Sequence, residues 1–167
     1  MIFDRNEHKP VIALLGAGSM GTAIVRRIAA GKKILLGDIS EKNLERVSHD
    51  FQYSGYDVET MIAKRVNHLQ AMKAAATTWK ARRARINTLS PGVIVTPLAY
   101  DEFAAAGEGY QRMIDASAAE RTGTSDEIAE AGAFLLGEHA GFITGTDLLI
   151  DGGTIAAIRT GQYKLGR

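Results

Sequence analysis

The sequence predicts an α/β protein in which helices cover both faces of a parallel β-sheet. Short, continuous apolar runs, the pattern of strands buried on both faces, alternate with segments of helical period. This alternation is typical of a doubly wound sheet. The first apolar run also leads directly into a glycine-rich turn and a helix, at residues 16–21. Together these features predict a Rossmann-like fold.

The front portion, residues 11–60, contains the first predicted strands and helices. Helix signals include Ser40 as a cap and Gly31 and Gly55 as stops. We expect a strand at 11–15, a helix from about 20 to 31, a strand at 34–36, a helix at about 40–55 and a short strand at 56–60.

The back portion, residues 61–153, begins with a long predicted helix at about 61–82, whose apolar stripe we interpret as core or subunit contact. A strand at 85–89 follows, broken by Pro91 and Gly92. Residues 97–119 predict a mobile loop with at least one helical turn. Thr124 and Glu127 form a capping box for a helix that Gly137 ends. A last strand at 147–150 precedes the C-terminal tail, residues 154–167, and the 167 residues suit a single domain.

Composition excludes several classes of function. A formal net charge of +1 gives no general electrostatic case for nucleic acid or acidic membranes. The sequence has no cysteine, and its four histidines lack metal-ligand spacing, so we expect no metal site. No apolar run approaches the ~20 residues of a membrane helix. The polar N-terminus does not resemble a secretory signal. We therefore expect a cytoplasmic protein.

The turn G-A-G-S-M-G carries the clearest chemical signal. Gly16 permits a tight turn, Gly18 lets the backbone approach a pyrophosphate, and Gly21 allows close packing of helix on strand. The helix that follows offers free N–H groups to phosphates. We therefore place Ser19 and Met20 in the predicted cofactor site together with the three glycines.

Asp38 ends the second predicted strand, 17 residues after Gly21. A carboxylate at this position can accept hydrogen bonds from an adenosine ribose and repels a 2′-phosphate. The sequence therefore predicts NAD as cofactor in preference to NADP. Ile39, the next residue, belongs to the same predicted site. The alternative for Asp38 is a structural turn or cap residue.

Three motifs in the back portion indicate a family. They are S-P-G-V-I-V-T-P (90–97), R-T-G-T-S-D-E-I-A (121–129) and I-T-G-T-D-L-L-I-D-G-G (143–153), and they resemble the short-chain dehydrogenase/reductase family. The resemblance implies that Pro91 and Gly92 close over the nicotinamide, with Ile94 beside the ring and Thr96 near the carboxamide. It also implies that Lys64, in A-K-R-V-N, is the active-site lysine. The glycine turn departs from the family's usual T-G-x-x-x-G-x-G.

Two catalytic groups of that family have no counterpart here. Members carry a tyrosine four residues before the lysine, on one helix, and a serine from an earlier strand. Position 60 holds threonine, and Tyr56, eight residues before Lys64, is the nearest phenol. The family's Asn-Asn-Ala-Gly segment and the central strands of the sheet are also missing, as if a segment between Thr60 and Met61 had been removed.

The resemblance implies an NAD-dependent oxidoreductase that interconverts a secondary alcohol and a carbonyl and forms a homo-oligomer. Three alternatives remain open for this chain. It is an enzyme whose central segment is absent from the sequence, an internally deleted protein that binds a nucleotide or partner without catalysis, or a fragment that persists only as an oligomer. The sequence does not identify the substrate.

Overall fold

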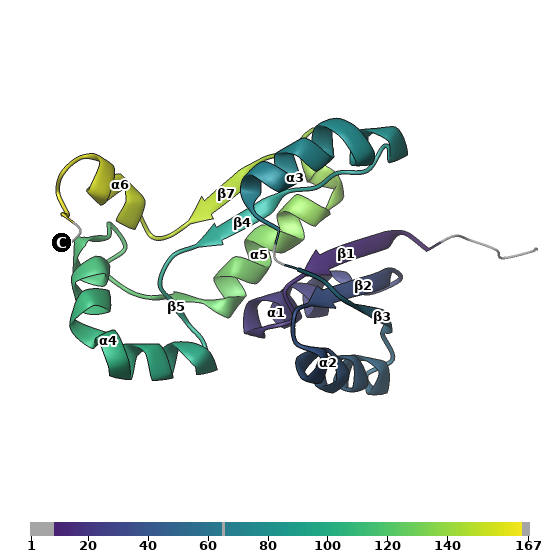
Figure 1. Ribbon diagram of the computed structural model, residues 1–167, viewed down its shortest axis with the longest axis horizontal. Helices are drawn as coiled ribbons and strands as arrows, with labels where there is room; N and C mark the ends of the chain where they lie inside the picture. Colours follow the sequence, from purple (N-terminus) through teal and green to yellow (C-terminus); the bar gives the residue numbers. More distant parts are fainter. Residues whose placement is uncertain (1–8, 65, 165–167) are drawn as a thin grey trace, which may run out of the picture. The chain divides into compact units, whose positions relative to one another are not determined.

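The computed structural model describes residues 9–64 and 66–164, which form two compact units, residues 1–65 and 66–167. The first unit has the order β1 (Val11–Leu15), α1 (Ser19–Ile28), β2 (Lys33–Asp38), α2 (Glu41–Tyr53) and β3 (Asp57–Ile62). Its three strands are parallel, in the order β1-β2-β3 (Figure 1). Strand–helix–strand repetition of this kind is the first half of a doubly wound α/β fold, so the predicted Rossmann-like fold class is confirmed.

The core of the first unit lies between one face of this sheet and the two helices. Ile34 and Leu36 of β2 are fully buried there, against the apolar sides of α1 and α2. The opposite face is bare, and Val11 and Leu15 of β1 are 65% and 49% exposed. The prediction that β1 is buried on both faces is therefore wrong. Among the described residues, β1 has β2 as its only partner strand, which fits a sheet without its central strands.

The second unit contains two short parallel strand pairs. Strand β4 (Thr88–Pro91) pairs with β7 (Asp147–Ile150), and β5 (Ile94–Val95) pairs with β6 (Gly123–Thr124). The α-helices of this unit are α3 (His68–Ala74), α4 (Pro97–Ala116), α5 (Ser125–Leu136) and α6 (Thr154–Arg159). Helix α3 continues through a π-helical turn and a 3-10 turn to Arg82. A further 3-10 turn lies at Glu138–Ala140. The capping box of Thr124 and Glu127 is present as predicted.

Two predicted elements differ from the structure. The helix expected from Met61 begins only at His68, because β3 continues through Met61 and Ile62 and Asn67 forms a capping box with Gln70. The apolar stripe that we interpret as core or subunit contact is largely exposed within this chain, with Leu69 72% exposed, so it is not core. Subunit contact stays a prediction. The loop expected at 97–119 is largely the 20-residue helix α4.

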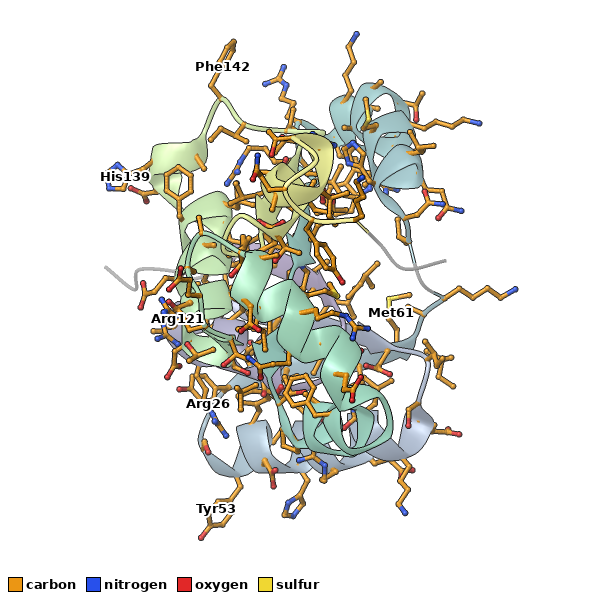
Figure 2. All side chains as sticks on the ribbon, turned by 90° about the vertical axis from the view of Figure 1, so that its left-hand side faces the viewer. Arg26, Tyr53, Met61, Arg121, His139 and Phe142 are labelled. Atoms are coloured by element: carbon orange, nitrogen blue, oxygen red, sulfur yellow. The ribbon has the colours of Figure 1, made fainter. Side chains whose placement is uncertain are left out.

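Side chains on the outside of both units include several apolar groups. Tyr53 of the first unit and Phe142 of the second point away from the ribbon (Figure 2), and they are 90% and 104% exposed. No helix in the described part of the chain has both the length and the apolar character that a membrane crossing requires.

Candidate functional site

The glycine turn after β1 has the geometry that the motif predicts. Gly16 has a φ of +117°, a conformation that L side chains rarely adopt. Its N–H donates to the carbonyl of Gly37 on β2, at 2.7 Å. A Cβ added at Gly21 would lie 1.8 Å from the carbonyl oxygen of Gly16, so α1 packs against the turn at a distance that only glycine permits.

Gly18 differs from its two partners because it leaves space open. A Cβ added there would meet no atom within 4 Å, and Gly18 has extended backbone angles at the N-cap of α1. No side chain caps this helix, and its first turn carries no acidic residue. Ser19 and Met20 are its first two residues, in the turn whose N–H groups point out of the start of the helix. The turn can therefore accept an anionic group close to the backbone.

Asp38 lies at the carboxyl end of β2, beside this turn. Its Oδ2 atom accepts a hydrogen bond from the N–H of Ala17 at 2.7 Å, and its Oδ1 atom accepts one from the N–H of Ser40 at 2.9 Å. Burial alone would raise the pKa of Asp38, but hydrogen bonds from the backbone N–H groups of Ser40, Ala17 and Ile39 outweigh it, and the pKa lies below its ordinary value. The carboxylate is thus held ionised.

A carboxylate offers about four lone-pair positions, and the N–H groups of Ala17 and Ser40 occupy two of them, with Ile39 and the Asn43 side chain as further donors nearby. A ribose hydroxyl that binds Asp38 would share the carboxylate with these donors. The following residue, Ile39, is 67% exposed. Asp38 can therefore be both a turn or cap residue and a residue that binds the cofactor. Sequence reasoning missed Asn43, whose side-chain amide donates to the carbonyl of Ala17 at 3.0 Å. Its position three residues after the cap Ser40 is the only sequence signal for it.

Lys64 lies in the segment between β3 and α3, and it is exposed. Thr60 lies in a strand as predicted, but the prediction that Lys64 lies on the following helix is wrong, because α3 begins only at His68. Tyr56 precedes β3 at the opposite end of the strand and packs edge-to-face on Phe51, with 5.5 Å between ring centroids. Six residues of extended chain separate Tyr56 from Ile62, about 20 Å. Tyr56 is therefore poorly placed to replace the missing catalytic phenol.

The Pro91–Gly92 turn is fixed to the end of β7 in the second unit. Gly92 donates its N–H to the carbonyl of Ile150 at 2.9 Å. A Cβ added at Gly92 would come within 2.6 Å of the Cα atom of Asp151, so this close backbone approach requires glycine. Pro91 is the last residue of β4 rather than a residue outside it.

Hydrogen bonds to Asp147 hold β4 beside β7 directly before that turn. The hydroxyls of Thr88 and Ser90 donate to the two carboxylate oxygens of Asp147, at 2.6 and 2.7 Å. Burial acts to raise the pKa of Asp147, but these two bonds and the charge of His68 lower it below its ordinary value. Sequence reasoning did not find this cluster, because its members are far apart along the chain.

Ile94 and Thr96 follow the turn. Ile94 is buried in β5, with 8% exposed. The Thr96 hydroxyl caps α4 by accepting a hydrogen bond from the N–H of Ala99 at 3.1 Å. The structure therefore assembles two separate groups of predicted site residues: the glycine turn with Asp38 in the first unit, and residues 91–96 in the second.

Among the described side chains, no group of three or more His, Asp or Glu could hold a metal ion.

Comparison with known proteins identifies the lineage. Residues 43–154 match the family described as enoyl-(acyl carrier protein) reductase. The short-chain dehydrogenase/reductase bsc3 of Alternaria brassicicola is 42% identical over 106 residues, which are 63% of this chain and 37% of that protein. The chain belongs to the short-chain dehydrogenase/reductase family. A second relative, the galactitol 2-dehydrogenase (L-tagatose-forming) of Cereibacter sphaeroides, is 31% identical over 135 residues, 81% of this chain and 49% of that protein.

Solved structures support the same fold. The crystal structure of gox2181 superposes with a TM-score of 0.72 at 16% identity, over 89% of this chain and 96% of that one. The chain spans half or less of the length of the two curated short-chain dehydrogenase/reductase relatives described above. This shortness agrees with the absence of a central segment from the family pattern.

Proposed function

We propose that this member of the short-chain dehydrogenase/reductase family binds NAD in preference to NADP through its first unit. The observation that carries the proposal is the Asp38 carboxylate, held ionised at the end of β2 beside the glycine turn. A ribose bearing free hydroxyls can donate to that carboxylate, whereas a 2′-phosphate would meet a negative charge. The pyrophosphate would lie over Gly18 at the start of α1, where no side chain fills the space.

Calorimetric titration of the full chain with NAD and with NADP tests the proposal. We expect the wild-type chain to bind NAD more tightly, and Asp38→Asn to reduce the ratio of the two affinities by about tenfold, the size of one charge-assisted contact. Asp50→Asn, which neutralises an exposed acid on α2, is the matched control and should leave the ratio unchanged. An unchanged ratio in Asp38→Asn would reduce Asp38 to a residue that only holds the turn.

The activity that we propose for the lineage is the interconversion of a secondary alcohol and a carbonyl. Nicotinamide would supply the hydride chemistry. Thr96 would donate its hydroxyl proton to the carboxamide while its oxygen caps α4, and Lys64 would bind ribose hydroxyls through its ammonium group. Pro91, Gly92 and Ile94 would form the wall beside the ring. The relative named as a galactitol 2-dehydrogenase supports a hydroxylated small molecule as substrate class.

A second candidate function is nucleotide binding without catalysis, in a homo-oligomeric remnant of the family. The position of Thr60 in a strand favours it, because no phenol stands on a helix with Lys64. Exposed Leu69 and Met72 on α3 provide apolar surface for self-association. Sedimentation of the wild-type chain and of Leu69→Lys tests self-association through α3. Loss of the oligomer in Leu69→Lys, with retention in the control Tyr53→Lys, would support contact through α3.

A further inference from the structure

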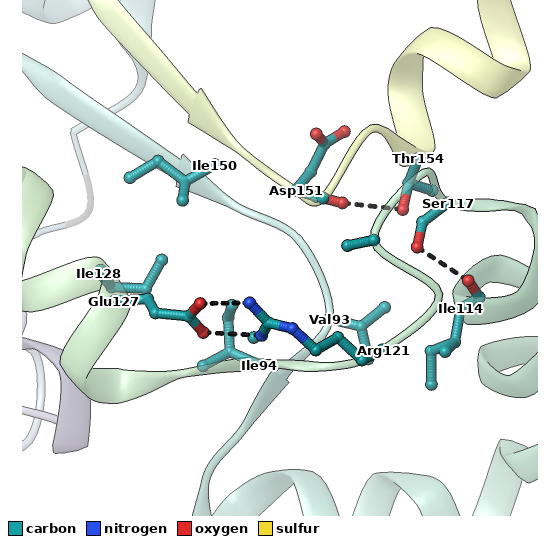
Figure 3. Close-up of a pocket in the computed structure, with 13 residues that line it drawn as sticks. Val93, Ile94, Ile114, Ser117, Arg121, Glu127, Ile128, Ile150, Asp151 and Thr154 are labelled. Carbon is teal, nitrogen blue, oxygen red and sulfur yellow. Dashed lines mark hydrogen bonds and ion pairs between the residues drawn. The ribbon is translucent and has the colours of Figure 1, made fainter.

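A pocket of about 210 Å³ opens into the second unit, between α4, the start of α5 and the end of β7 (Figure 3). Five aliphatic side chains supply most of its wall: Val93, Ile94, Ile114, Ile128 and Ile150. Ile94 and Ile128 are buried, with 8% and 2% exposed. None of these residues belongs to the glycine turn or to the Asp38 site of the first unit, and only Ile94 is shared with the residues proposed to lie beside the nicotinamide.

The polar groups around this pocket already bond to one another. The Ser117 hydroxyl donates to the carbonyl of Ile114 at 2.8 Å and accepts the N–H of Glu120 at 3.1 Å. The two carboxylate oxygens of Asp151 accept the N–H groups of Gly153 and Ile155. Among the described residues, no buried side-chain nitrogen or oxygen lacks a partner. The buried polar side-chain atoms around the pocket are therefore already paired, and its unpaired contact surface is mainly aliphatic.

The mouth of the pocket is charged but internally neutralised. Arg121 donates two hydrogen bonds to Glu127, at 3.0 and 2.6 Å (Figure 3). Both side chains are exposed, at 58% and 43%, as is the neighbouring Ala119. Because each charge already has its partner, a charged ligand would gain little here and would have to lose its own hydration. An uncharged ligand can pass the mouth without that cost.

We propose that this pocket binds a compact, uncharged hydrocarbon ring, either as a small molecule or as the end of a larger one. A buried water needs two to four polar partners, and a dry apolar cavity of about 150 Å³ in another protein holds benzene. The present pocket is somewhat larger, and the buried polar side-chain atoms in the described part of the chain all have partners. It therefore has room for a six-membered ring with a small substituent, which would replace water at an apolar wall.

The test is titration of the isotope-labelled full chain with benzene, followed by NMR, without nucleotide. We expect saturable shifts centred on the signals of Val93, Ile128 and Ile150. Benzoate, which has the same ring with a charge, should bind at least about tenfold more weakly because of its desolvation. Shifts that do not saturate, that lie elsewhere, or that are matched by benzoate would overturn the proposal.

A pair of variants on α4 provides the structural control. Ile114→Phe fills the pocket from its wall and should abolish the benzene shifts, whereas Met113→Phe adds the same ring at the adjacent position, outside the pocket lining, and should retain them. Equal benzene binding by both variants would contradict the assignment. If Ile114→Phe fails to fold, the wild-type comparison of benzene with benzoate still decides the question. Because no nucleotide is present, failure here leaves the dinucleotide proposal unaffected.

Discussion

The carboxylate of Asp38 accepts a hydrogen bond from the backbone N–H of Ala17 at 2.7 Å. This bond joins the end of β2 to the glycine turn after β1, across 21 residues of sequence. The turn is therefore stiffened by the same side chain that is proposed to select the cofactor. A binding site whose recognition group also supports its backbone is preorganised, because less conformational freedom is lost when the ligand binds.

Substitutions at Gly18 and Gly21 should have different effects on NAD affinity and on the free energy of unfolding. Gly18→Ala places a methyl group in open space and at allowed backbone angles. We therefore expect its free energy of unfolding to change by less than about 0.5 kcal/mol, as for an ordinary surface substitution. Its NAD affinity should nevertheless fall, because the methyl group stands where the pyrophosphate would approach. Calorimetry and urea unfolding measure the two effects.

Gly21→Ala should instead lower the stability of the protein. Its methyl group would lie 1.8 Å from the carbonyl oxygen of Gly16, a backbone atom that cannot rotate away. We expect destabilisation of about 3 kcal/mol or more, at the upper end of the cost of overpacking. If the urea midpoint of Gly21→Ala equals that of the wild-type chain, the close packing of α1 on the turn is not a feature of the protein in solution.

The ion pair of Arg121 and Glu127 predicts a pH dependence of stability. Hydrogen bonds from Arg121, and then from the N–H of Thr124, lower the pKa of Glu127 from 4.5 to about 2. Because the folded pKa is below the unfolded one, the stabilisation is present above pH 4.5 and is lost as the pH falls toward 2. Glu127→Gln should therefore lower the urea midpoint at pH 7, and this difference should shrink at pH 3.

Glu108→Gln is the control for that experiment. Glu108 is 95% exposed and lies 3.6 Å from Arg112 within α4, so its replacement should have little effect at either pH. A gap between wild type and Glu127→Gln that stays constant from pH 7 to pH 3 would show that ionisation of Glu127 is not its source.

Glu120 occupies a backbone conformation that favours glycine, with a φ of +51°. A non-glycine residue there costs about 1–2 kcal/mol, while glycine costs roughly 0.5–1 kcal/mol of extra chain entropy. We expect Glu120→Gly to raise the free energy of unfolding by about 0.5–1 kcal/mol, which corresponds to a Tm increase of about 1–4 °C. Ala118→Gly, in the same turn but without a positive φ, should lower the Tm. Calorimetry that finds both variants destabilised would exclude strain at Glu120.

Sequence patterns predicted those elements whose signals are local. The capping box of Thr124 and Glu127, the cap Ser40 and the strand at 147–150 all lie where short-range rules place them. The helix α4 was missed although Thr96 followed by Pro97 is an N-cap and first-turn signature. Its Ala- and Gly-rich sequence lacks the apolar period on which the prediction relied.

Long-range contacts could not be derived from the sequence in the same way. Nothing local indicates that Arg85 donates to the carbonyls of Leu135 and Gly137 at the end of α5, or that Thr88 and Ser90 share Asp147. Burial of β1 was misjudged for a related reason. An apolar run indicates what a strand could bury, but the exposure of Val11 and Leu15 depends on which partner elements the chain supplies.

The last prediction concerns turnover. Thr60 lies in β3 and Lys64 follows the strand, so the four residue steps from one to the other span about 13 Å if extended. On a helix, the Cβ atoms at i and i+4 are about 5–6 Å apart. A phenol at position 60 would therefore not meet the ammonium group as it would on a helix. General acid–base catalysis contributes typically about 10² to 10⁴ in rate. We expect the 167-residue chain to oxidise NADH with ketones at a rate near background, and Thr60→Tyr to remain equally slow. The galactitol 2-dehydrogenase relative serves as positive control for the assay. Restoration of turnover by Thr60→Tyr, using protein of verified mass, would mean that residues 60–64 become helical in solution, and would reinstate Lys64 as the partner of a catalytic phenol.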